Sequence, residues 1–331
     1  MRILVLGLTG YLGGHAAEQL RALPGARLLG GGRAPAAGLA VDLATIGSRQ
    51  LADMIASFEP DAVVNCAGAV GGDAVTLAEV NVRGPAVLCA ALREAAPRAR
   101  LVHLGSAAEY GPTAHGERVT ESAATRPAGP YGATKLAGTV AVTAAGLDSV
   151  VLRVGNPVGP GAPAAGLPGR LVQQLRQAGR ADGDPDAIVR LGDLSAYRDF
   201  VDVRDIARAV VLATTAPGPL PPVLNIGGGR ALPVRDLVHG LARAADFRGR
   251  IEESRDGSPR SSDVSWQCSD ITAAATALGW VPRYGLAESL ADLWASARTG
   301  PEPEPERAQT PAPPLAPAPA PAPESAGDRG R

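Results

Sequence analysis

The first 155 residues alternate short runs of β-branched and aliphatic residues with longer amphipathic segments. The runs expected to form strands are 2–6, 27–29, 62–66, 101–104 and 150–154, and the segments expected to form helices include 12–23, 77–95 and 131–145. Strands that alternate with helices along a chain form a parallel sheet whose two faces the helices cover. The pattern therefore predicts an α/β fold built on a doubly wound parallel sheet.

A glycine-rich turn directly follows the first expected strand. The stretch ILVLGLTGYLGG places three glycines, each three residues apart, between that strand and the first expected helix. Glycine permits a tight turn and lets backbone N–H groups approach a pyrophosphate, whose negative charge is favoured at a helix N-terminus. This context predicts a dinucleotide-binding turn of the Rossmann type. The residues expected to contact the cofactor there are Gly7, Thr9, Gly10, Tyr11, Leu12 and Gly13.

The end of the second expected strand bears on which nucleotide is bound. NAD-binding folds usually carry an Asp or Glu there for the ribose 2′-hydroxyl, whereas this strand ends LLGGGR. Because no carboxylate is there to repel a 2′-phosphate and Arg33 can bind one, we expect NADP(H), with NAD(H) as the alternative. Further cofactor contacts are expected from Asp42 and Leu43 at the adenine edge and from Cys66, Ala67 and Gly68 in the stretch NCAG.

Lys135 is the only lysine in the chain, and in the stretch YGATK it follows Tyr131 by four residues. Residues four apart on a helix share one face. A free tyrosine has a pKa of about 10, and a nearby ammonium and a cationic nicotinamide favour the phenolate. Ser106 in HLGSAAEYG, just past another expected strand, can donate to the same substrate oxygen. We therefore predict that Tyr131, Lys135 and Ser106 are catalytic.

These stretches together resemble the extended short-chain dehydrogenase/reductase family, the NAD-dependent epimerases and dehydratases that act on nucleotide sugars. The stretches GLTGYLGG, NCAG, NVRGPAVL, GSAAEYG, YGATK, LRVGNPVGPG, RDFVDVRD and LGWVP occur in the family's order over residues 1–295. The resemblance implies Tyr131 as general acid/base, Lys135 as its partner and ribose ligand, and Ser106 as the oxygen-binding hydroxyl. It also implies that Asn81 lies near the cofactor loop.

The resemblance also implies a substrate site. Asn156 would meet the sugar or its phosphate, and Arg198 and Arg260 would bind the diphosphate of a nucleotide sugar, for which two guanidiniums are chemically suited. Dehydratases of the family carry an Asp–Glu pair where this chain has Ala107 and Ala108, and Glu109 is out of step with that pair. Dehydration is therefore not expected.

We expect the protein to reduce the 4-keto group of a nucleotide-linked 4-keto-6-deoxy sugar with NAD(P)H. The stretches VRLGDLSAYRDFVDVRDIARAV, SPRSSDV and LGWVP look most like GDP-4-keto-6-deoxy-mannose reductases and similar nucleotide-sugar ketoreductases of deoxysugar biosynthesis. A nucleotide-sugar 4-epimerase with tightly bound NAD is the first alternative. A non-enzymatic dinucleotide-binding or scaffold protein is the second, and a substrate that is not a sugar is open within the reductase class.

The chain is expected to divide into a dinucleotide-binding domain and a smaller lobe. Residues 1–165 form the domain, to which 196–228 return, and 166–195 and 229–299 form a substrate-binding lobe. Residues 300–331 are rich in Pro, Ala and Glu, which predicts a disordered tail.

Charge and cysteine content limit the partners. A net charge of -1 gives no reason to expect nucleic acid or an anionic membrane as a partner. Three cysteines without a C-x-x-C spacing predict neither a disulfide framework nor a metal site. The chain begins without a signal-like segment, so we expect a cytoplasmic protein. The family resemblance implies a homodimer, formed by the Ala-rich helices 77–95 and 131–145.

Overall fold

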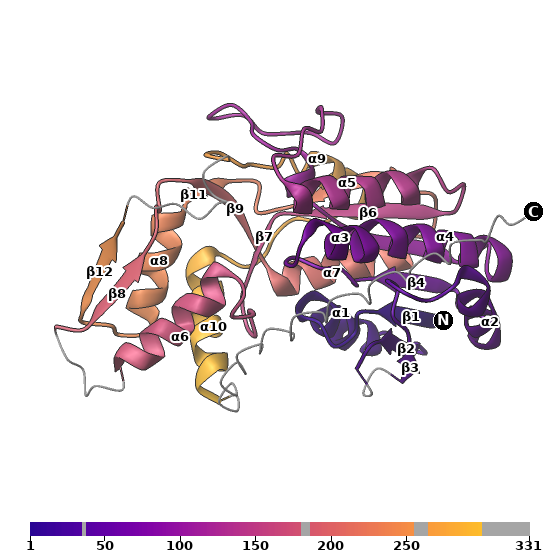
Figure 1. Cartoon of the computed structure of the whole chain (residues 1–331), viewed down its shortest axis with the longest axis horizontal. Helices are drawn as coiled ribbons and strands as arrows, with labels where there is room; N and C mark the ends of the chain where they lie inside the picture. The colour runs from indigo at the N-terminus through magenta and orange to yellow at the C-terminus, as the bar shows by residue number, and fades with distance from the viewer. Residues whose placement is uncertain (35–37, 180–185, 255–263, 300–331) are drawn as a thin grey trace, which may run out of the picture. The chain divides into compact units, whose positions relative to one another are not determined.

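The computed structural model describes residues 1–34, 38–179, 186–254 and 264–299, and its core is a seven-stranded sheet (Figure 1). The strand order is β10-β6-β5-β4-β1-β2-β3, and every neighbouring pair is parallel. The strands are β1 (Arg2–Leu6), β2 (Arg27–Gly32), β3 (Leu39–Ala40), β4 (Ala62–Asn65), β5 (Arg100–Ser106), β6 (Ser149–Val154) and β10 (Val223–Ile226). The chain winds outward from β1 to β3 and then adds β4, β5 and β6 on the other side, which confirms the predicted doubly wound sheet.

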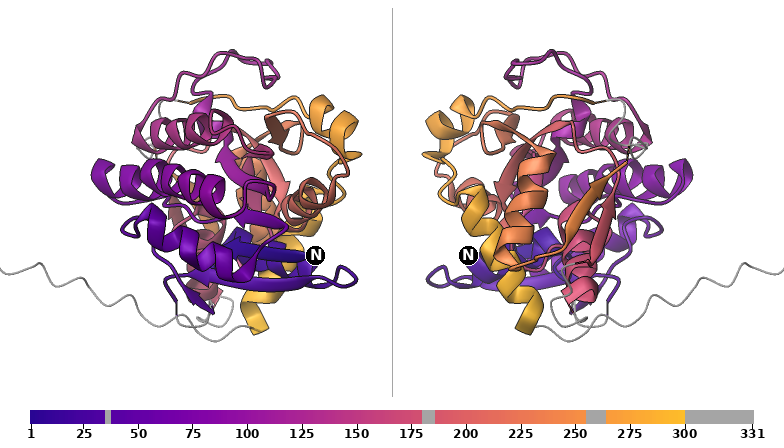
Figure 2. Two further views of the ribbon diagram at one scale, coloured as in Figure 1. Left: turned by 90° about the vertical axis from the view of Figure 1, so that its right-hand side faces the viewer. Right: turned by 90° about the vertical axis from the view of Figure 1, so that its left-hand side faces the viewer.

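Helices cover both faces of this sheet because successive residues of its strands point to opposite sides. Ile3 and Val5 of β1 pack into a core with α1 (Tyr11–Arg21), α7 (Val203–Thr215) and α9 (Thr272–Leu278). Leu4 and Leu6 of the same strand pack into a second core with α2 (Ser48–Phe58), α4 (Gly84–Ala95) and α5 (Pro130–Thr143). Figure 2 shows these helices on either side of the sheet.

The helix before β5 is longer than expected. It begins with α3 (Ala74–Ala78), passes through a π-helical turn η2 (Glu79–Arg83) and continues as α4. By length and composition alone, Ala74–Ala95 could cross a membrane, but 44% of its most apolar window is buried inside the protein. Because α4 packs between α2 and α5, the apolar residues of this helix are explained by the core of the fold.

A further group of elements surrounds its own apolar core. A three-stranded sheet of order β11-β9-β7 and a pair β12-β8 belong to it. The strands are β7 (Asn156–Val158), β8 (Ile188–Leu191), β9 (Tyr197–Asp202), β11 (Ala231–Pro233) and β12 (Arg250–Glu253), and the helices are α6 (Leu167–Gly179), α8 (Val234–Ala244) and α10 (Leu286–Thr299). Leu171, Leu237, Leu241 and Leu290 are fully buried in this core. The expected tail, 300–331, lies outside the described residues.

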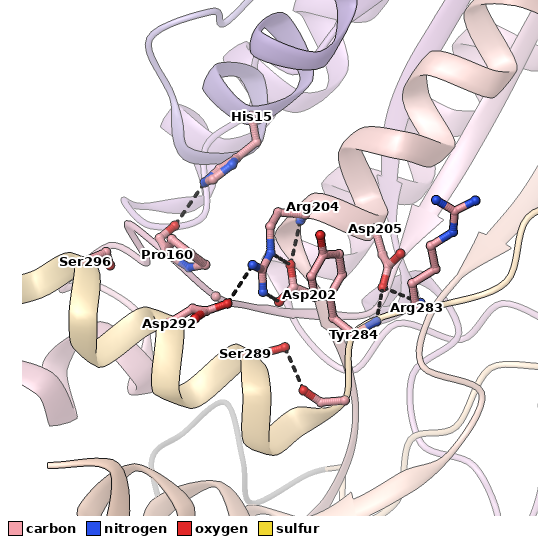
Figure 3. Close-up of polar contacts among 12 residues, drawn as sticks. His15, Pro160, Asp202, Arg204, Asp205, Arg283, Tyr284, Ser289, Asp292 and Ser296 are labelled. Atoms are coloured by element: carbon pink, nitrogen blue, oxygen red, sulfur yellow. Dashed lines mark hydrogen bonds and ion pairs between the residues drawn. The ribbon is translucent and has the colours of Figure 1, made fainter.

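A polar junction connects this second group to the helix that follows the glycine turn (Figure 3). Asp202 caps α7 and accepts hydrogen bonds from Arg204, whose other guanidinium nitrogen pairs with Asp292 of α10 at 2.6 Å. On α1, the ring of His15 forms a 3.0 Å hydrogen bond with the carbonyl oxygen of Pro160. The His15 contact holds α1 against the loop after β7, and the Arg204 contacts connect α7 to α10.

Candidate active site

The glycine turn brings three backbone segments closer together than any other residue type permits. Gly7 has a left-handed φ of 78°, and a Cβ there would lie 2.7 Å from the backbone nitrogen of Ala67. A Cβ on Gly13 would overlap the carbonyl oxygen of Gly7. Gly10 precedes the first residue of α1 and donates its N–H to Gly7 at 3.0 Å. Since the first N–H groups of a helix lack intrahelical acceptors, the turn can bind a pyrophosphate there.

The other residues predicted to contact the adenosine end lie beside β2 and β3. Arg33 is exposed directly after the last residue of β2. Asp42 accepts a 3.0 Å hydrogen bond from the backbone of Ala44, and the carbonyl oxygen of Leu43 accepts one from Arg83 at 3.0 Å. These contacts shape the turn after β3.

Tyr11, which is predicted to contact the cofactor, also contacts the loop after β7. Its hydroxyl donates to the carbonyl oxygen of Gly159 at 3.2 Å, and desolvation with the nearby Asp202 charge raises its pKa. The side chain thus connects the first turn of α1 to the loop after β7. Thr9 lies in the glycine turn, and Leu12 lies in the first turn of α1 beside the apolar core.

Asn81 holds the loop after β4 against α5. This side chain is 1% exposed, and it exchanges two 2.9 Å hydrogen bonds with the backbone of Ala69. Its amide nitrogen also donates to the hydroxyl of Thr134 at 3.2 Å. A Cβ on Gly68 would lie 3.4 Å from Asn81 Oδ1 and 3.8 Å from the ammonium nitrogen of Lys135. The loop that contains the NCAG stretch therefore lies beside both Asn81 and Lys135.

Tyr131 and Lys135 occupy successive turns of α5. Pro130 begins the helix, where its fixed φ and missing N–H are tolerated. Lys135 is 5% exposed, and its ammonium donates to the carbonyl oxygen of Leu104 in β5 at 2.5 Å. Desolvation lowers the pKa of Lys135 to about 8, and the negative charge of Glu109 opposes that shift. Tyr131 is half-buried one turn earlier.

Ser106 is the last residue of β5 and is 8% exposed. Its hydroxyl oxygen accepts a 3.2 Å hydrogen bond from the backbone of Ala108 and caps the short 3₁₀ turn η3 (Ala107–Glu109). Helix α5 approaches this turn so closely that a Cβ on Gly132 would lie 2.5 Å from the carbonyl oxygen of Ala108. The turn after Ser106 and the first turn of α5 are therefore in contact.

Two of the residues expected to bind substrate, Asn156 and Arg198, lie in β7 and β9. Asn156 donates its amide to the backbone of Asp199 at 3.3 Å and to the side chain of Gln267 at 2.6 Å. Arg198 is half-buried and donates to the carbonyl oxygen of Tyr197 at 2.8 Å, and desolvation lowers its pKa. Arg260 lies outside the described residues.

Three aromatic rings pack against one another, and two of them lie next to these residues in sequence. The ring of Trp266 packs against His115 with centroids 4.2 Å apart and against Tyr197 with centroids 5.2 Å apart. Trp266 precedes Gln267 in sequence, and Tyr197 precedes Arg198. Sequence analysis did not find Gln267, because its contact with Asn156 joins residues 111 positions apart and no local pattern marks it.

Glu109 is a second residue that sequence analysis did not place in the site. It is fully buried, and its carboxylate accepts hydrogen bonds from the backbone of Ser106 at 2.8 Å and from Thr139 at 3.0 Å. Arg153 of β6 pairs with its other oxygen at 2.7 Å. The available signal was a single carboxylate that directly follows the small residues GSAA at the end of an expected strand.

The assembled side chains suit proton transfer beside a bound nucleotide. The phenol of Tyr131 and the buried ammonium of Lys135 come from α5, and the hydroxyl of Ser106 comes from the end of β5. These groups lie next to the loop after β4, which contacts the glycine turn. Among the described residues, no group of three or more His, Cys, Asp and Glu side chains is placed to hold a metal ion.

Comparison with known proteins identifies the family. Residues 3–227 match the model of the NAD dependent epimerase/dehydratase family. The chain is 37% identical over 311 residues to dTDP-6-deoxy-L-talose 4-dehydrogenase (NAD(P)(+)) of Kitasatospora kifunensis, covering 91% of this chain and 96% of that protein. It is 28% identical to GDP-6-deoxy-D-mannose reductase of Pseudomonas aeruginosa, covering 87% and 94%.

Solved structures agree with this result. The crystal structure of Thermus thermophilus UDP-glucose 4-epimerase with NAD superimposes with a TM-score of 0.76 at 27% identity, covering 90% of this chain and 99% of that one. The resemblance found in the sequence is thereby confirmed. The chain belongs to the NAD dependent epimerase/dehydratase family, within a group of NAD(P)-dependent nucleotide-sugar dehydrogenases, reductases and epimerases.

Proposed function

We propose that this enzyme reduces the 4-keto group of a nucleotide-linked 4-keto-6-deoxy sugar with NADPH. The observation that carries the proposal is the placement of Tyr131 and Lys135 on α5 against the turn that follows Ser106. The missing Asp–Glu pair at Ala107 and Ala108 argues against dehydration.

The proposed chemistry assigns one task to each side chain. NADPH, held at the glycine turn, would supply the hydride that reduces the C4 carbon. The hydroxyl of Ser106 donates a hydrogen bond to the carbonyl oxygen and stabilises its developing charge. The phenol of Tyr131 gives its proton to that oxygen, which produces the alcohol and a phenolate. The ammonium of Lys135 stabilises the phenolate through its positive charge.

The names of two relatives support chemistry at a deoxysugar. One is a 4-dehydrogenase of a dTDP-linked 6-deoxy sugar, and another is a reductase named for a GDP-linked 6-deoxy sugar. Dehydrogenation of an alcohol and reduction of the ketone are the two directions of one equilibrium. The same side chains therefore serve both directions, and the supply of oxidised or reduced cofactor sets the net direction.

The preference for NADP(H) rests on the end of β2. That end carries no carboxylate, and the exposed guanidinium of Arg33 follows it. Arg33→Ala should raise the KM for NADPH by about 10-fold, because one charge-assisted contact is lost, and leave that for NADH within about twofold. Equal effects on the two cofactors would refute the assignment of Arg33 to the 2′-phosphate.

The decisive experiment incubates the protein with NADPH and a panel of GDP-, dTDP- and UDP-linked 4-keto-6-deoxy sugars, and follows absorbance of the reduced cofactor. Tyr131→Phe should remove most turnover and leave the Kd for NADPH nearly unchanged. Unchanged kcat in that variant contradicts the mechanism. Interconversion of two sugars without net cofactor consumption would instead identify a 4-epimerase.

We also propose that the protein is a cytoplasmic homodimer formed through α4 and α5. Val75 of α3 and Val140 of α5 are 65% and 56% exposed, respectively, although both are apolar. Val140→Glu should shift the mass measured by light scattering from two chains to one. A single-chain mass for the wild type contradicts this proposal.

A further inference from the structure

Glu109 is a carboxylate buried beneath the proposed catalytic residues. Its side chain has no exposed surface, and the side chain of its partner Arg153 is 6% exposed. Burying a charge is costly unless it is paired and hydrogen-bonded. This carboxylate satisfies that condition with an ion pair and two further hydrogen bonds.

The partners of Glu109 come from each element that carries a proposed catalytic residue. One oxygen accepts from the backbone N–H of Ser106 and from the hydroxyl of Thr139. Thr139 lies on α5 four residues after Lys135 and eight after Tyr131, so the three share one helix face. The carboxylate thus fixes the end of β5 relative to the helix that carries the phenol and the ammonium.

The space around this carboxylate is tight. A Cβ on Gly105 would lie 2.7 Å from Glu109 Oε1 and 3.3 Å from the hydroxyl of Thr139. Gly105 pairs in register with Arg153 across β5 and β6, and the guanidinium of Arg153 lies 4.6 Å from the centre of the Tyr110 ring. A change at Glu109 therefore moves its neighbours.

The charge of Glu109 also acts on the buried ammonium. The titratable groups around Lys135 are Glu109 of η3, Cys66 after β4, His103 of β5 and Tyr131 of α5, with Arg153 of β6 behind Glu109. The Cys66 thiol has its pKa raised to about 12 by desolvation, and burial lowers the pKa of His103 so that it is neutral near pH 7. Glu109, which pairs with Arg153, is therefore the one carboxylate of this set.

We propose that Glu109 is a positioning residue, which holds Ser106 and α5 in one arrangement and places a carboxylate beneath the buried Lys135. This inference rests on the proposed roles of Ser106, Tyr131 and Lys135 in proton transfer. It assigns a function to a carboxylate that contacts the reacting groups only through other residues.

The single lysine of the chain makes this proposal directly measurable. Protein labelled with ¹³C,¹⁵N-lysine gives one side-chain ε-methylene resonance, whose pH titration reports the pKa of Lys135 without any substrate. In Glu109→Gln that pKa should fall by about one pH unit or more, because the opposing negative charge is lost. With a nucleotide sugar that the wild type reduces, kcat should fall by about 10-fold or more. In the plot of kcat against pH, the decline on the basic side should move to lower pH.

Asp205→Asn is the matched control. Asp205 is fully buried and pairs with Arg208 at 3.1 Å, and it accepts hydrogen bonds from the backbone of Arg283 and Tyr284 (Figure 3). That variant also loses a buried charge, yet it should leave the pKa of Lys135 and the pH dependence of kcat unchanged. An equal effect of both variants would show that Glu109 is structural only and would overturn the proposal.

Two further outcomes are informative. If Glu109→Gln does not fold, the double variant Glu109→Gln with Arg153→Met removes the whole ion pair and leaves no unpaired buried charge, and its lysine is titrated instead. If the pKa of Lys135 is unshifted in whichever variant folds, the proposal is overturned. It is also overturned if neither Glu109 variant folds while Asp205→Asn does fold. A wild type that reduces none of the nucleotide sugars refutes the proposed function, whereas the lysine titration still tests Glu109.

Discussion

Replacing Lys135 by Met tests whether the proposed catalytic lysine is buried at a cost to the fold. In the wild type Lys135 is 5% exposed, and desolvation lowers its pKa from 10.5 to about 8. That difference corresponds to about 3 kcal/mol of destabilisation whenever the lysine is charged in both the folded and the unfolded chain. Methionine has similar length and no charge, so it removes this cost.

The pH dependence gives the sign of the effect. Below pH 8 both forms of the chain carry the charged lysine, and the full cost is present. As the pH rises from 8 toward 10.5, the folded chain loses this proton first, so the unfolded chain binds more protons and the fold becomes more stable. Between pH 7.5 and 9.5 the Lys135 contribution should raise the free energy of unfolding by about 2 kcal/mol.

The cysteine thiols act in the opposite direction, and their contribution must cancel in the comparison. Burial and desolvation raise the pKa of Cys66 to about 12 and of Cys89 to about 11. The unfolded chain therefore loses these protons first, and stability falls as pH rises above 9. In wild type and in Lys135→Met alike, both thiols stay protonated in the folded chain up to pH 9.5, so the difference between the two proteins isolates the lysine.

Guanidinium unfolding at pH 7.5, 8.5 and 9.5, without added nucleotide, measures this difference. At pH 7.5 the variant loses the hydrogen bond to Leu104, worth about 2 kcal/mol, so its stability should match the wild type to within about 1 kcal/mol. At pH 9.5 the wild type should have gained about 2 kcal/mol relative to the variant. If the free energy of unfolding changes with pH in the same way in both proteins, the argument that burying the charged Lys135 destabilises the fold is refuted.

Three further substitutions follow from contacts in the structure. Gly13→Ala should abolish NADPH binding, measured by fluorescence, because its Cβ would overlap the carbonyl oxygen of Gly7; retained binding would show that the turn can shift. Asn81→Ala should raise the Kd for NADPH by about 10-fold, since the loop at Ala69 loses both hydrogen bonds that fix it, and an unchanged Kd counts against this role. Arg100→Met should lower the free energy of unfolding by about 2–4 kcal/mol, because its guanidinium pairs with a carboxylate and three carbonyl groups; kcat should stay constant, and a large loss of kcat would contradict its purely structural role.

Local sequence patterns were enough to predict the parts of the fold that depend on short segments of the chain. The strand at 2–6 is β1 with the predicted ends, and the other expected strands differ from the observed ones by a few residues at their ends. β2 extends to Gly32 because its last two residues pair with β3, and β3 is only two residues long. Such pairings depend on a neighbour in space, so hydrophobic runs alone did not show them.

The proposed site shows the same division between local and distant causes. The spacing of Tyr131 and Lys135 on one helix and of the glycines in the first turn follows from helix geometry and from the room that only glycine leaves. The carbonyl partner of Lys135, at Leu104, lies 31 residues away in sequence. The pairs of Glu109 with Arg153 and Asn156 with Gln267 span 44 and 111 residues.

By itself, the sequence determined the parallel sheet, the glycine turn and the phenol–ammonium pair, because each depends on sterics and periodicity within a short segment. Only the tertiary structure decided that the lysine is buried and that a carboxylate lies beneath it. It also decided that β10 returns beside β6. Burial and charge pairing depend on which distant segments the packed core brings together, and a single sequence carries no local signal for those contacts.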